Sequence, residues 1–322
     1  MDAVLIANPT ARLVESAISI DSVVECLKGS GLHVYVKLTE QAEDARSFAR
    51  EAVEAGIPRV VAAGGDGTIN EVVQALAGTE TELAIVPLGT GNVIARYVGL
   101  DDRNYAASCD VAAGEHVRQI DLGKMDGRYF VATAGAGIDA QVAQNLDPWW
   151  KQQMGKVAYM TEFLRSVLMQ EPHVFRITVD GQIIEGPMWG VLICNTDEFT
   201  WRIKLASDVR DDDGLLDMLL IHRHGYLDLM DLAARMFFAG EPAKGHPTAT
   251  VIRAASMRIE AQPPVPWQVE GDPQGMTPVD VTIAPRALRL VMSTDRPAKE
   301  EETPVSLIAD AVSTPKGPEG RQ

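Results

Sequence analysis

The sequence predicts an α/β fold, with an N-terminal parallel α/β domain followed by a largely antiparallel β domain. Three observations support this. Short apolar runs alternate with helical patterns over residues 1–116, as in parallel sheets with helical crossovers. Two of these runs end in glycine-rich loops, which often join a buried strand to a helix. From residue 117 onward, short alternating runs separated by turn residues are typical of antiparallel strands.

Each expected element of the first domain has a local signal. An apolar run breaks at Asn8-Pro9, and a helix then continues to Leu27 and is closed by Gly29. Thr39 is a suitable N-cap for the Ala-rich helix that follows it. The expected strands are 3–7, 33–38, 60–63 and 83–86. Of the expected helices, one ends at residue 27, the second spans 41–55, the third begins near 68 and the fourth spans 93–97.

The second domain is expected to be built from hairpins with two helices inserted. Asp180-Gly181 between two alternating runs is a strong hairpin signal. The expected strands are 129–132, 174–179, 182–184, 189–194, 215–221 and 279–284, and the expected helices are 155–169 and 226–239. The segment 295–322 is rich in Glu, Pro, Ser, Thr and Gly, which predicts a disordered tail. We therefore divide the chain into domains 1–116 and 117–294 and the tail 295–322.

Composition limits the possible partners. The 322 residues, 46% of them hydrophobic, suffice for two cores. The net charge of -16, from 29 basic and 45 acidic residues, argues against nucleic acid and against purely electrostatic adhesion to anionic lipid. Any membrane contact should therefore be local and apolar.

The three cysteines and the N-terminus indicate the cellular compartment of the protein. Cys26, Cys109 and Cys194 are odd in number, far apart and set in apolar surroundings, which favours buried free thiols in a reducing compartment over disulfides or metal ligands. The start of the chain has no basic segment, and no apolar run approaches ~20 residues. We expect a cytoplasmic, soluble protein.

The first glycine-rich loop, Gly64-Gly65-Asp66-Gly67, has the composition of a phosphate site. Glycine can take positive φ and lets the backbone approach a ligand, while the helix opening near Thr68 offers N–H groups and a positive dipole end. Asp66 would repel a phosphate unless a divalent cation or its water lies between them, so the loop indicates a metal-nucleotide. An ordinary strand-to-helix turn is the alternative.

A second glycine-rich loop follows the strand expected at 83–86. It reads Pro87-Leu88-Gly89-Thr90-Gly91-Asn92, and a helix starts after it. In doubly wound sheets ligands bind beyond the carboxyl ends of the strands. Both loops should therefore lie at one edge and serve one site.

Together, the Gly-Gly-Asp-Gly-Thr and Pro-x-Gly-Thr-x-Asn blocks resemble those of the diacylglycerol kinase catalytic domain family. This family includes sphingosine kinases and bacterial lipid kinases and is distantly similar to NAD kinases. The matching stretches run from Asn8 to Asp272. The resemblance implies a Rossmann-like nucleotide domain and a β-sandwich lipid domain, with ATP and Mg²⁺ as cofactors.

The resemblance also implies roles for individual residues at the nucleotide site. Asp66 would join a water-linked metal network. The positions that match nucleotide contacts in the family are Thr39, Gly64, Gly65, Asp66, Gly67, Thr68, Ile69, Asn70 and Thr90.

The acidic run, which we define as residues 209–217, suggests a cation site. Crowded carboxylates suit a hard cation, although a solvated acidic turn explains the run equally well. Similar lipid kinases carry an Asp-Gly-Leu-Leu-Asp run here. The resemblance implies a magnesium ion held by Asp213 and by main-chain oxygens of Arg210 and Leu215.

A second acidic motif, Glu270-Gly271-Asp272, corresponds to the Asp-Gly-Glu of the family. The last acid of that motif is taken as the base that accepts the substrate hydroxyl proton, so the resemblance assigns this role to Asp272. Glu and Asp have exchanged places, and Asp272 is one methylene shorter than the residue it matches. A β-turn acid is the alternative, because Gly-Asp-Pro is also good turn chemistry.

Two further departures from the family concern the nucleotide loops. Asn8-Pro9 is not followed by the usual Ser-Gly. Val93 stands where many bacterial lipid kinases have an Asp that supports the metal network, although sphingosine kinases also lack it. These differences leave the metal geometry and full activity open.

Other candidate residues carry weaker signals. His222 and His224 lack companion ligands and are expected to be surface or hydrogen-bonded histidines rather than zinc ligands. The run 135–139 is too short for a dinucleotide fingerprint. Four aromatic residues near the helix at 155–169 suit core packing, with lipid entry or membrane docking as the alternative: Trp149, Trp150, Tyr159 and Phe163.

The sequence thus predicts an ATP-dependent lipid kinase that phosphorylates a hydroxyl of a diacylglycerol-like or sphingoid lipid at a membrane surface. The protein would be cytoplasmic and peripheral at the membrane, with a homodimer as an open option. A NAD kinase-like enzyme is the first alternative. A nucleotide-binding regulatory protein that has lost turnover through Val93 and Asp272 is the second.

Overall fold

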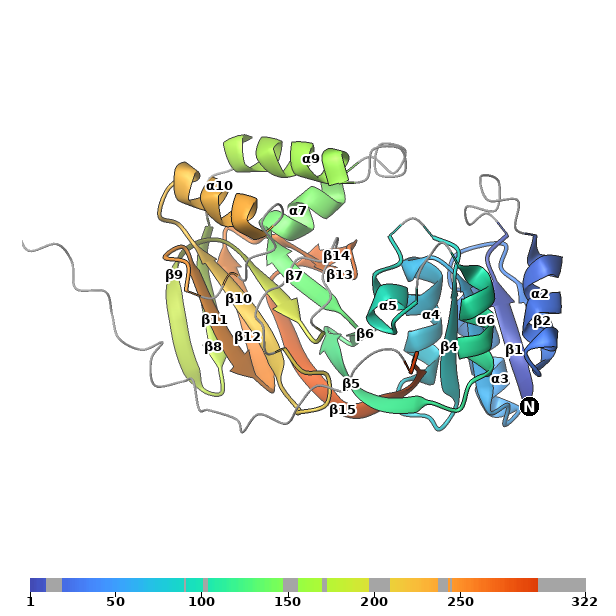
Figure 1. The fold of residues 1–322 in the computed structure, drawn as a ribbon. Coiled ribbons are helices and arrows are strands. Elements are labelled where there is room, and N and C mark those ends of the chain that lie inside the picture. Colours follow the sequence, from blue (N-terminus) through green and yellow to red (C-terminus); the bar gives the residue numbers. More distant parts are fainter. Residues whose placement is uncertain are drawn as a thin grey trace, which may run out of the picture.

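The computed structural model describes residues 1–9, 19–89, 91–100, 104–146, 156–169, 173–196, 209–236, 243 and 245–294. Thr90 and the segment 295–322 lie outside these ranges, so the expectations for them are not addressed. The α/β class is confirmed, with parallel strands in the first part and antiparallel strands in the second. Figure 1 shows the two parts as separate lobes that share two long strands at their base.

The first lobe is a parallel sheet in the order β4-β3-β1-β2. Its strands are the apolar runs of the sequence, and β3 is buried along its whole length. The strands are β1 (Asp2–Ala7), β2 (His33–Leu38), β3 (Arg59–Gly64) and β4 (Glu82–Pro87). The helices are α2 (Ile20–Gly29), α3 (Asp44–Glu54), α4 (Asp66–Leu76), α5 (Val93–Tyr97) and α6 (Tyr105–Ala113).

Helices cover both faces of this sheet because successive strand residues point to opposite sides. Helices α3 and α4 pack on one face, against Val4, Ile6 and Val60 among others. Helices α2 and α6 pack on the other face. Thr39 does not cap α3, since the N-cap residue is Glu43 and the side chain of Asp44 accepts the N–H groups of the preceding loop.

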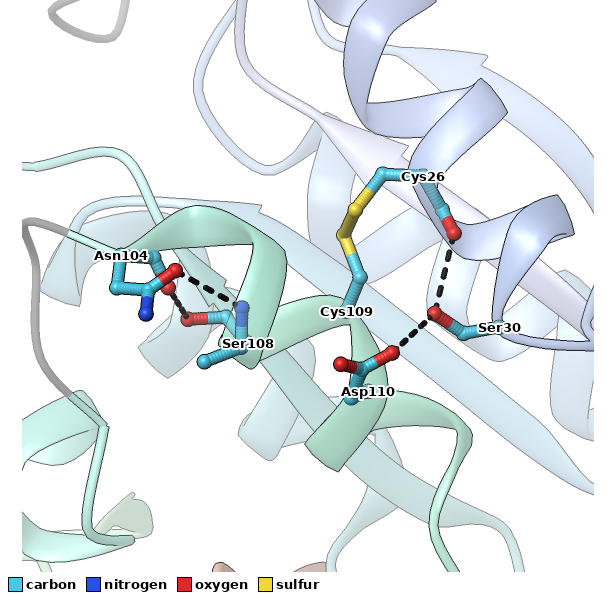
Figure 2. The surroundings of a disulfide bond; sticks show 7 residues. Cys26, Ser30, Asn104, Ser108, Cys109 and Asp110 are labelled. Atoms are coloured by element: carbon cyan, nitrogen blue, oxygen red, sulfur yellow. Dashed lines mark hydrogen bonds between the residues drawn. A yellow bond between two sulfur atoms is a disulfide. The ribbon is translucent and has the colours of Figure 1, made fainter.

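A disulfide joins Cys26 of α2 to Cys109 of α6, which contradicts the expected free thiols at these positions. The two helices lie side by side, so cysteines 83 residues apart in sequence have Cα atoms 6.1 Å apart. Figure 2 shows the bond and the neighbouring contact from Ser30 Oγ to the carboxylate of Asp110, at 2.7 Å. Sequence spacing alone does not show this proximity. Cys194 is a buried free thiol, as expected.

The second lobe is antiparallel. Its strands are β5 (Val117–Met125), β6 (Arg128–Phe130), β7 (Thr133–Gly137), β8 (His173–Val179), β9 (Gln182–Cys194), β10 (Leu216–His222), β11 (Ala249–Ala254), β12 (Ser256–Gln262), β13 (Pro266–Val269), β14 (Asp272–Met276) and β15 (Val279–Val291). Its helices are α7 (Ile138–Asn145), α9 (Lys156–Met169) and α10 (Tyr226–Ala234). Asp180 and Gly181 form the predicted hairpin turn, with positive φ at both residues. None of the described helices combines the length and apolarity needed to cross a bilayer.

Strand β9 joins two runs that the sequence predicts as separate strands. Its first half pairs with β8, and its second half pairs with both β7 and β10. The sheet therefore divides along β9 and encloses a single apolar core that includes Phe175, Ile193 and Trp267. Helices α7, α9 and α10 lie together over the outside of this sheet (Figure 1).

Strand β15 connects the two lobes. It pairs antiparallel with β12 and β5 and, near its end, parallel with β4. Its register shifts between Ala284 and Leu288, and Arg286 in that interval has φ of 49°. The lobes are thus parts of one continuous sheet. The division at residue 116 stays a prediction.

Candidate active site

Two glycine-rich loops meet at the carboxyl edge of the parallel strands. We call this edge, where the sequence predicts the nucleotide, the nucleotide edge. A Cβ on Gly89 would lie 2.5 Å from the Cα of Gly65, and a Cβ on Gly64 would lie 2.6 Å from Thr68 Oγ1. Glycine is therefore required for close packing of the loops. The expectation of positive φ at these glycines is wrong. None of Gly64, Gly65 and Gly67 has positive φ, and φ of Gly65 is -90°.

Asn92 and Asp66 hold the second loop in place. Asn92 is buried, has φ of 47°, and exchanges two hydrogen bonds with the backbone of Gly89, at 3.0 and 2.8 Å. Asp66 Oδ1 accepts the N–H of Ile94 at 3.2 Å, at the start of α5. The Asp66 side chain thus bridges both loops. Neither motif alone predicts this bridge.

The other described residues among the predicted nucleotide contacts follow strands β2 and β3, although not all direct a side chain toward this edge. Thr39 follows the end of β2, where its N–H bonds to Ala7 at 3.0 Å. Ile69 is fully buried in the core, its N–H bonds to Gly65 at 3.1 Å, and Asn70 Oδ1 accepts a hydrogen bond from Gln74. Helix α4 begins at Asp66 behind Gly65, which has no side chain to cap it. This arrangement is typical of phosphate sites at helix N-termini.

A carboxylate of the second lobe comes close to this edge. The hairpin β13–β14 turns at Glu270 and Gly271. Glu270 Oε1 accepts the N–H groups of Val131 and Ala132, both at 2.7 Å. Asp272 begins β14 and is exposed, so the structure places the two acids of the motif in different surroundings.

The surroundings of Glu270 shift its protonation. Burial, followed by repulsion from Asp66, raises the pKa of Glu270 from 4.5 to about 7, although the amides of Ala132, Val131 and Thr133 oppose the shift. A carboxyl whose pKa lies near neutrality can accept and release protons under ordinary conditions.

The predicted magnesium residues of the acidic run are engaged by protein groups. Asp213 accepts the Leu215 N–H at 3.1 Å and forms an ion pair with Arg253, which also lies 3.2 Å from Asp217. The side chain of Arg210 pairs with Asp212 at 3.0 Å. Among the residues that the structure describes, no three His, Cys, Asp or Glu side chains lie close enough together to hold a metal ion. The residues present therefore fit a cation only if Arg253 moves away.

Two buried aspartates fix the position of the acidic run. Asp211 accepts hydrogen bonds from the Tyr97 hydroxyl, on α5 of the first lobe, and from Arg118 at 2.8 Å. Asp121 accepts the N–H groups of Gly214 and Arg286, both at 2.7 Å. The sequence analysis missed Asp121, because its partners lie 93 and 165 residues away.

An apolar cavity lies under α9 and α10. It is partly open to solvent, and its volume counted together with the open solvent at its mouth is about 570 Å³. It is lined by Ile138, Asp139, Tyr159, Phe163, Val191, Leu192, Leu219, Ile221, Leu229, Leu232, Ala233 and Met236. Asp139 is the charged residue of the lining, and it accepts hydrogen bonds from Tyr159 and from Gln268, the latter at 2.6 Å. Burial raises the pKa of Asp139, partly offset by these two bonds.

Hydrogen bonds connect the cavity to the β13–β14 turn. Gln268, which reaches Asp139 in the cavity, also accepts the N–H of Gly271 at 2.6 Å in the β13–β14 turn. The same turn carries Glu270, which interacts with Asp66. The run 135–139 includes Asp139, but sequence spacing gave no signal for its partners.

Comparisons with known proteins agree with this architecture. Residues 2–125 match the diacylglycerol kinase catalytic domain, and residues 132–292 match the YegS C-terminal NAD kinase beta sandwich-like domain. The diacylglycerol kinase of Bacillus subtilis (strain 168) is 26% identical over 294 residues, covering 91% of this chain and 96% of that protein. The diacylglycerol kinase of Staphylococcus haemolyticus (strain JCSC1435) is 29% identical over 281 residues, covering 86% and 83%.

A solved structure shares the fold. The crystal structure of a diacylglycerol kinase from Bacillus anthracis (strain Sterne) matches with a TM-score of 0.75 at 24% identity, covering 91% of this chain and 97% of that one. Fold and site together define a phosphotransferase with a nucleotide lobe and a β-sandwich lobe. The chain belongs to the diacylglycerol kinase family and is a lipid kinase.

Proposed function

We propose that this lipid kinase transfers the γ-phosphate of ATP to a hydroxyl group of a diacylglycerol-like or sphingoid lipid. The observation that carries the proposal is the connected path from the apolar cavity, through Asp139 and Gln268, to the turn that faces Asp66. Apolar walls with one polar group at an end suit a lipid whose chains are buried and whose head group is oriented. In this proposal the head group lies at the Asp139 end of the cavity, which the hydrogen bonds of Gln268 join to that turn.

The protein's part in this reaction is alignment and neutralisation. The loop glycines let the backbone approach the phosphates, and the start of α4 presents N–H groups to them. A magnesium ion, when bound with ATP, supplies positive charge to the transferring phosphate. Asp66 lies where it can orient water around such an ion. The second magnesium site, at Arg210, Asp213 and Leu215, stays a prediction.

A peripheral membrane contact is part of the proposal, because the lipid must leave a bilayer to reach the cavity. We define the docking face as the outward apolar side chains of α9 and α10. They are Val157, Leu164, Leu168, Met169, Tyr226 and Leu227. The opposite sides of the same helices line the cavity, so only these two helices would separate a bilayer on this face from it. A homodimer stays a prediction without a structural argument.

Incubation of the purified protein with labelled ATP, Mg²⁺ and a total lipid extract tests the function, with dioleoylglycerol, sphingosine and NAD as defined acceptors. We expect label in a phospholipid product. Label on NAD and none on lipid would favour a NAD kinase. ATP binding without transfer to any acceptor would favour the regulatory alternative.

A further inference from the structure

The exchange of Glu and Asp in the β13–β14 hairpin has an unfavourable effect on the turn itself. Glu270 and Gly271 occupy the two central positions, with φ of 52° and 83°, between the paired residues Val269 and Asp272. Two-residue turns with positive φ at both positions favour Asn-Gly or Asp-Gly. Glutamate is uncommon in this conformation. The chain therefore has the longer acid at a position where the shorter one suits the backbone better.

The longer acid points inward. Glu270 is partly buried, and Oε1 reaches the N–H groups of Val131 and Ala132, where the chain enters β7. Its own N–H bonds to Thr133 at 2.9 Å, so backbone and side chain are both fixed against β7. Asp272 is exposed, and its main-chain oxygen accepts Gln274 at 3.2 Å. Glu270 is fixed and points inward, whereas Asp272 is exposed. Glu270 is therefore better placed than Asp272 for chemistry at the nucleotide edge.

We infer that Glu270, in place of Asp272, is the carboxylate that accepts the proton of the lipid hydroxyl. The inference rests on the proposed function. In this step the hydroxyl proton passes to the Glu270 carboxylate while the hydroxyl oxygen forms a bond to the γ-phosphorus of ATP. The bond from that phosphorus to the β,γ-bridging oxygen breaks, and ADP leaves with its electron pair.

The electrostatic surroundings support this role. Asp66 of α4 is the charged group that acts on Glu270, and it raises the pKa of the carboxyl further after burial has raised it. Strand β7, against which the turn packs, reads Thr-Ala-Gly-Ala-Gly and carries no titratable side chain. On β9 the thiol of Cys194 lies within electrostatic range, and burial raises its pKa well above the ordinary value, so it stays neutral. The exposed Asp272 is the remaining acid of the hairpin.

Steady-state kinetics of E270Q, E270D and D272N test the inference, with dioleoylglycerol or sphingosine micelles, whichever the wild type phosphorylates. In E270Q the amide oxygen can still accept both N–H groups, so the fold and the KM for ATP should be kept. We expect kcat to fall by roughly two to four powers of ten. E270D should retain more activity than E270Q, and D272N should lose far less. The exposed control E185Q should match the wild type.

The pH profile separates catalysis from a purely structural role. Wild-type kcat should rise with pH through a limb near neutrality, and E270Q should lose that limb. A merely structural Glu270 would leave kcat and its pH profile unchanged in E270Q, which would overturn the inference. A deeper loss in D272N than in E270Q would also overturn it and restore Asp272 as the base. A wild type that phosphorylates no lipid would overturn the proposed function, and the inference with it.

Discussion

The nucleotide edge and the acidic run are both acidic, yet their carboxylates have different partners. At the nucleotide edge Asp66 accepts the backbone N–H of Ile94 in α5 and repels Glu270. In the acidic run, Asp211 and Asp213 are neutralised by Arg118 and Arg253. At the first site a backbone N–H at the start of a helix holds the carboxylate. The other has its charge balanced within the protein.

The difference shows that a cluster of acids in a sequence does not by itself indicate a cation site. Arg253 lies 40 residues from Asp213 in sequence, and Arg118 lies 93 residues from Asp211. Experiments on the two sites can test whether their carboxylates differ in this way.

Removal of Arg253 should have the largest effect. R253A leaves the carboxylates of Asp213 and Asp217 without their counter-ion, and Asp217 is buried. We expect a loss of stability of ~4 kcal/mol, measured by thermal unfolding. Mg²⁺ should raise the melting temperature of R253A and leave that of the wild type unchanged in the absence of nucleotide.

Arg289 is the matched control, because its ion pair with Glu80 is exposed and R289A should cost less than ~1 kcal/mol. A wild type that Mg²⁺ stabilises, with the effect lost in D213N, would show that a metal binds here after all. The acidic run would then resemble the nucleotide edge.

The second effect is the pH dependence that Glu270 gives to stability. Its pKa is raised from 4.5 in the unfolded chain to about 7 in the folded protein, so folding favours the protonated form. The resulting stability is full below pH 4.5 and is lost as the pH rises through about 7, an interval that corresponds to ~3 kcal/mol. E270Q lacks this contribution. The stability of the wild type relative to E270Q should therefore fall by that amount between pH 4 and 8 in chemical denaturation, and a constant difference would contradict the shift.

The third effect concerns the glycines of the nucleotide edge. Even a Cβ at position 65 would lie 3.3 Å from the Cα of Gly89. The larger side chain of G65V would press against that atom and block the approach of phosphate. Calorimetry with Mg-ATP should show a loss of affinity of about 100-fold, or ~2.7 kcal/mol. G29A, with no atom within 4 Å of the new Cβ, is the control. Unchanged affinity in G65V would remove this loop from the site.

The smallest effect should come from the docking face. Leu168 and Leu227 are 68% and 85% exposed, and aspartate at both positions should weaken binding to phosphatidylcholine vesicles containing dioleoylglycerol by about tenfold, or ~1.4 kcal/mol. Sedimentation with vesicles measures this. The control carries aspartate at Tyr35 and Val36, which are also exposed but lie on the edge strand β2. Equal losses in both variants would remove the docking face from membrane binding.

The sequence predicts the parallel lobe better than the site. Strand β2 and helix α5 begin and end at the predicted residues, because an apolar run and its flanking turn residues are local signals. Strands β5 and β7 and helix α7 were not predicted individually, and β9 was split into two strands. Ile94, Arg253 and Arg286 lie 28, 40 and 165 residues from Asp66, Asp213 and Asp121, which they contact, so only tertiary structure can reveal these pairs.

Strand β15 has a consequence for the order in which the protein can fold during synthesis. It supplies the antiparallel partner of β5 and the outer neighbour of β4, yet it is the last described strand of the chain. While the ribosome is still making the second lobe, the open edge of the first lobe is thus unprotected. A nascent chain that ends before Val279 would carry the nucleotide loops but lack the strand that closes their sheet, so we expect it to need the rest of the chain to become stable. The first lobe thus becomes complete only when the second lobe does.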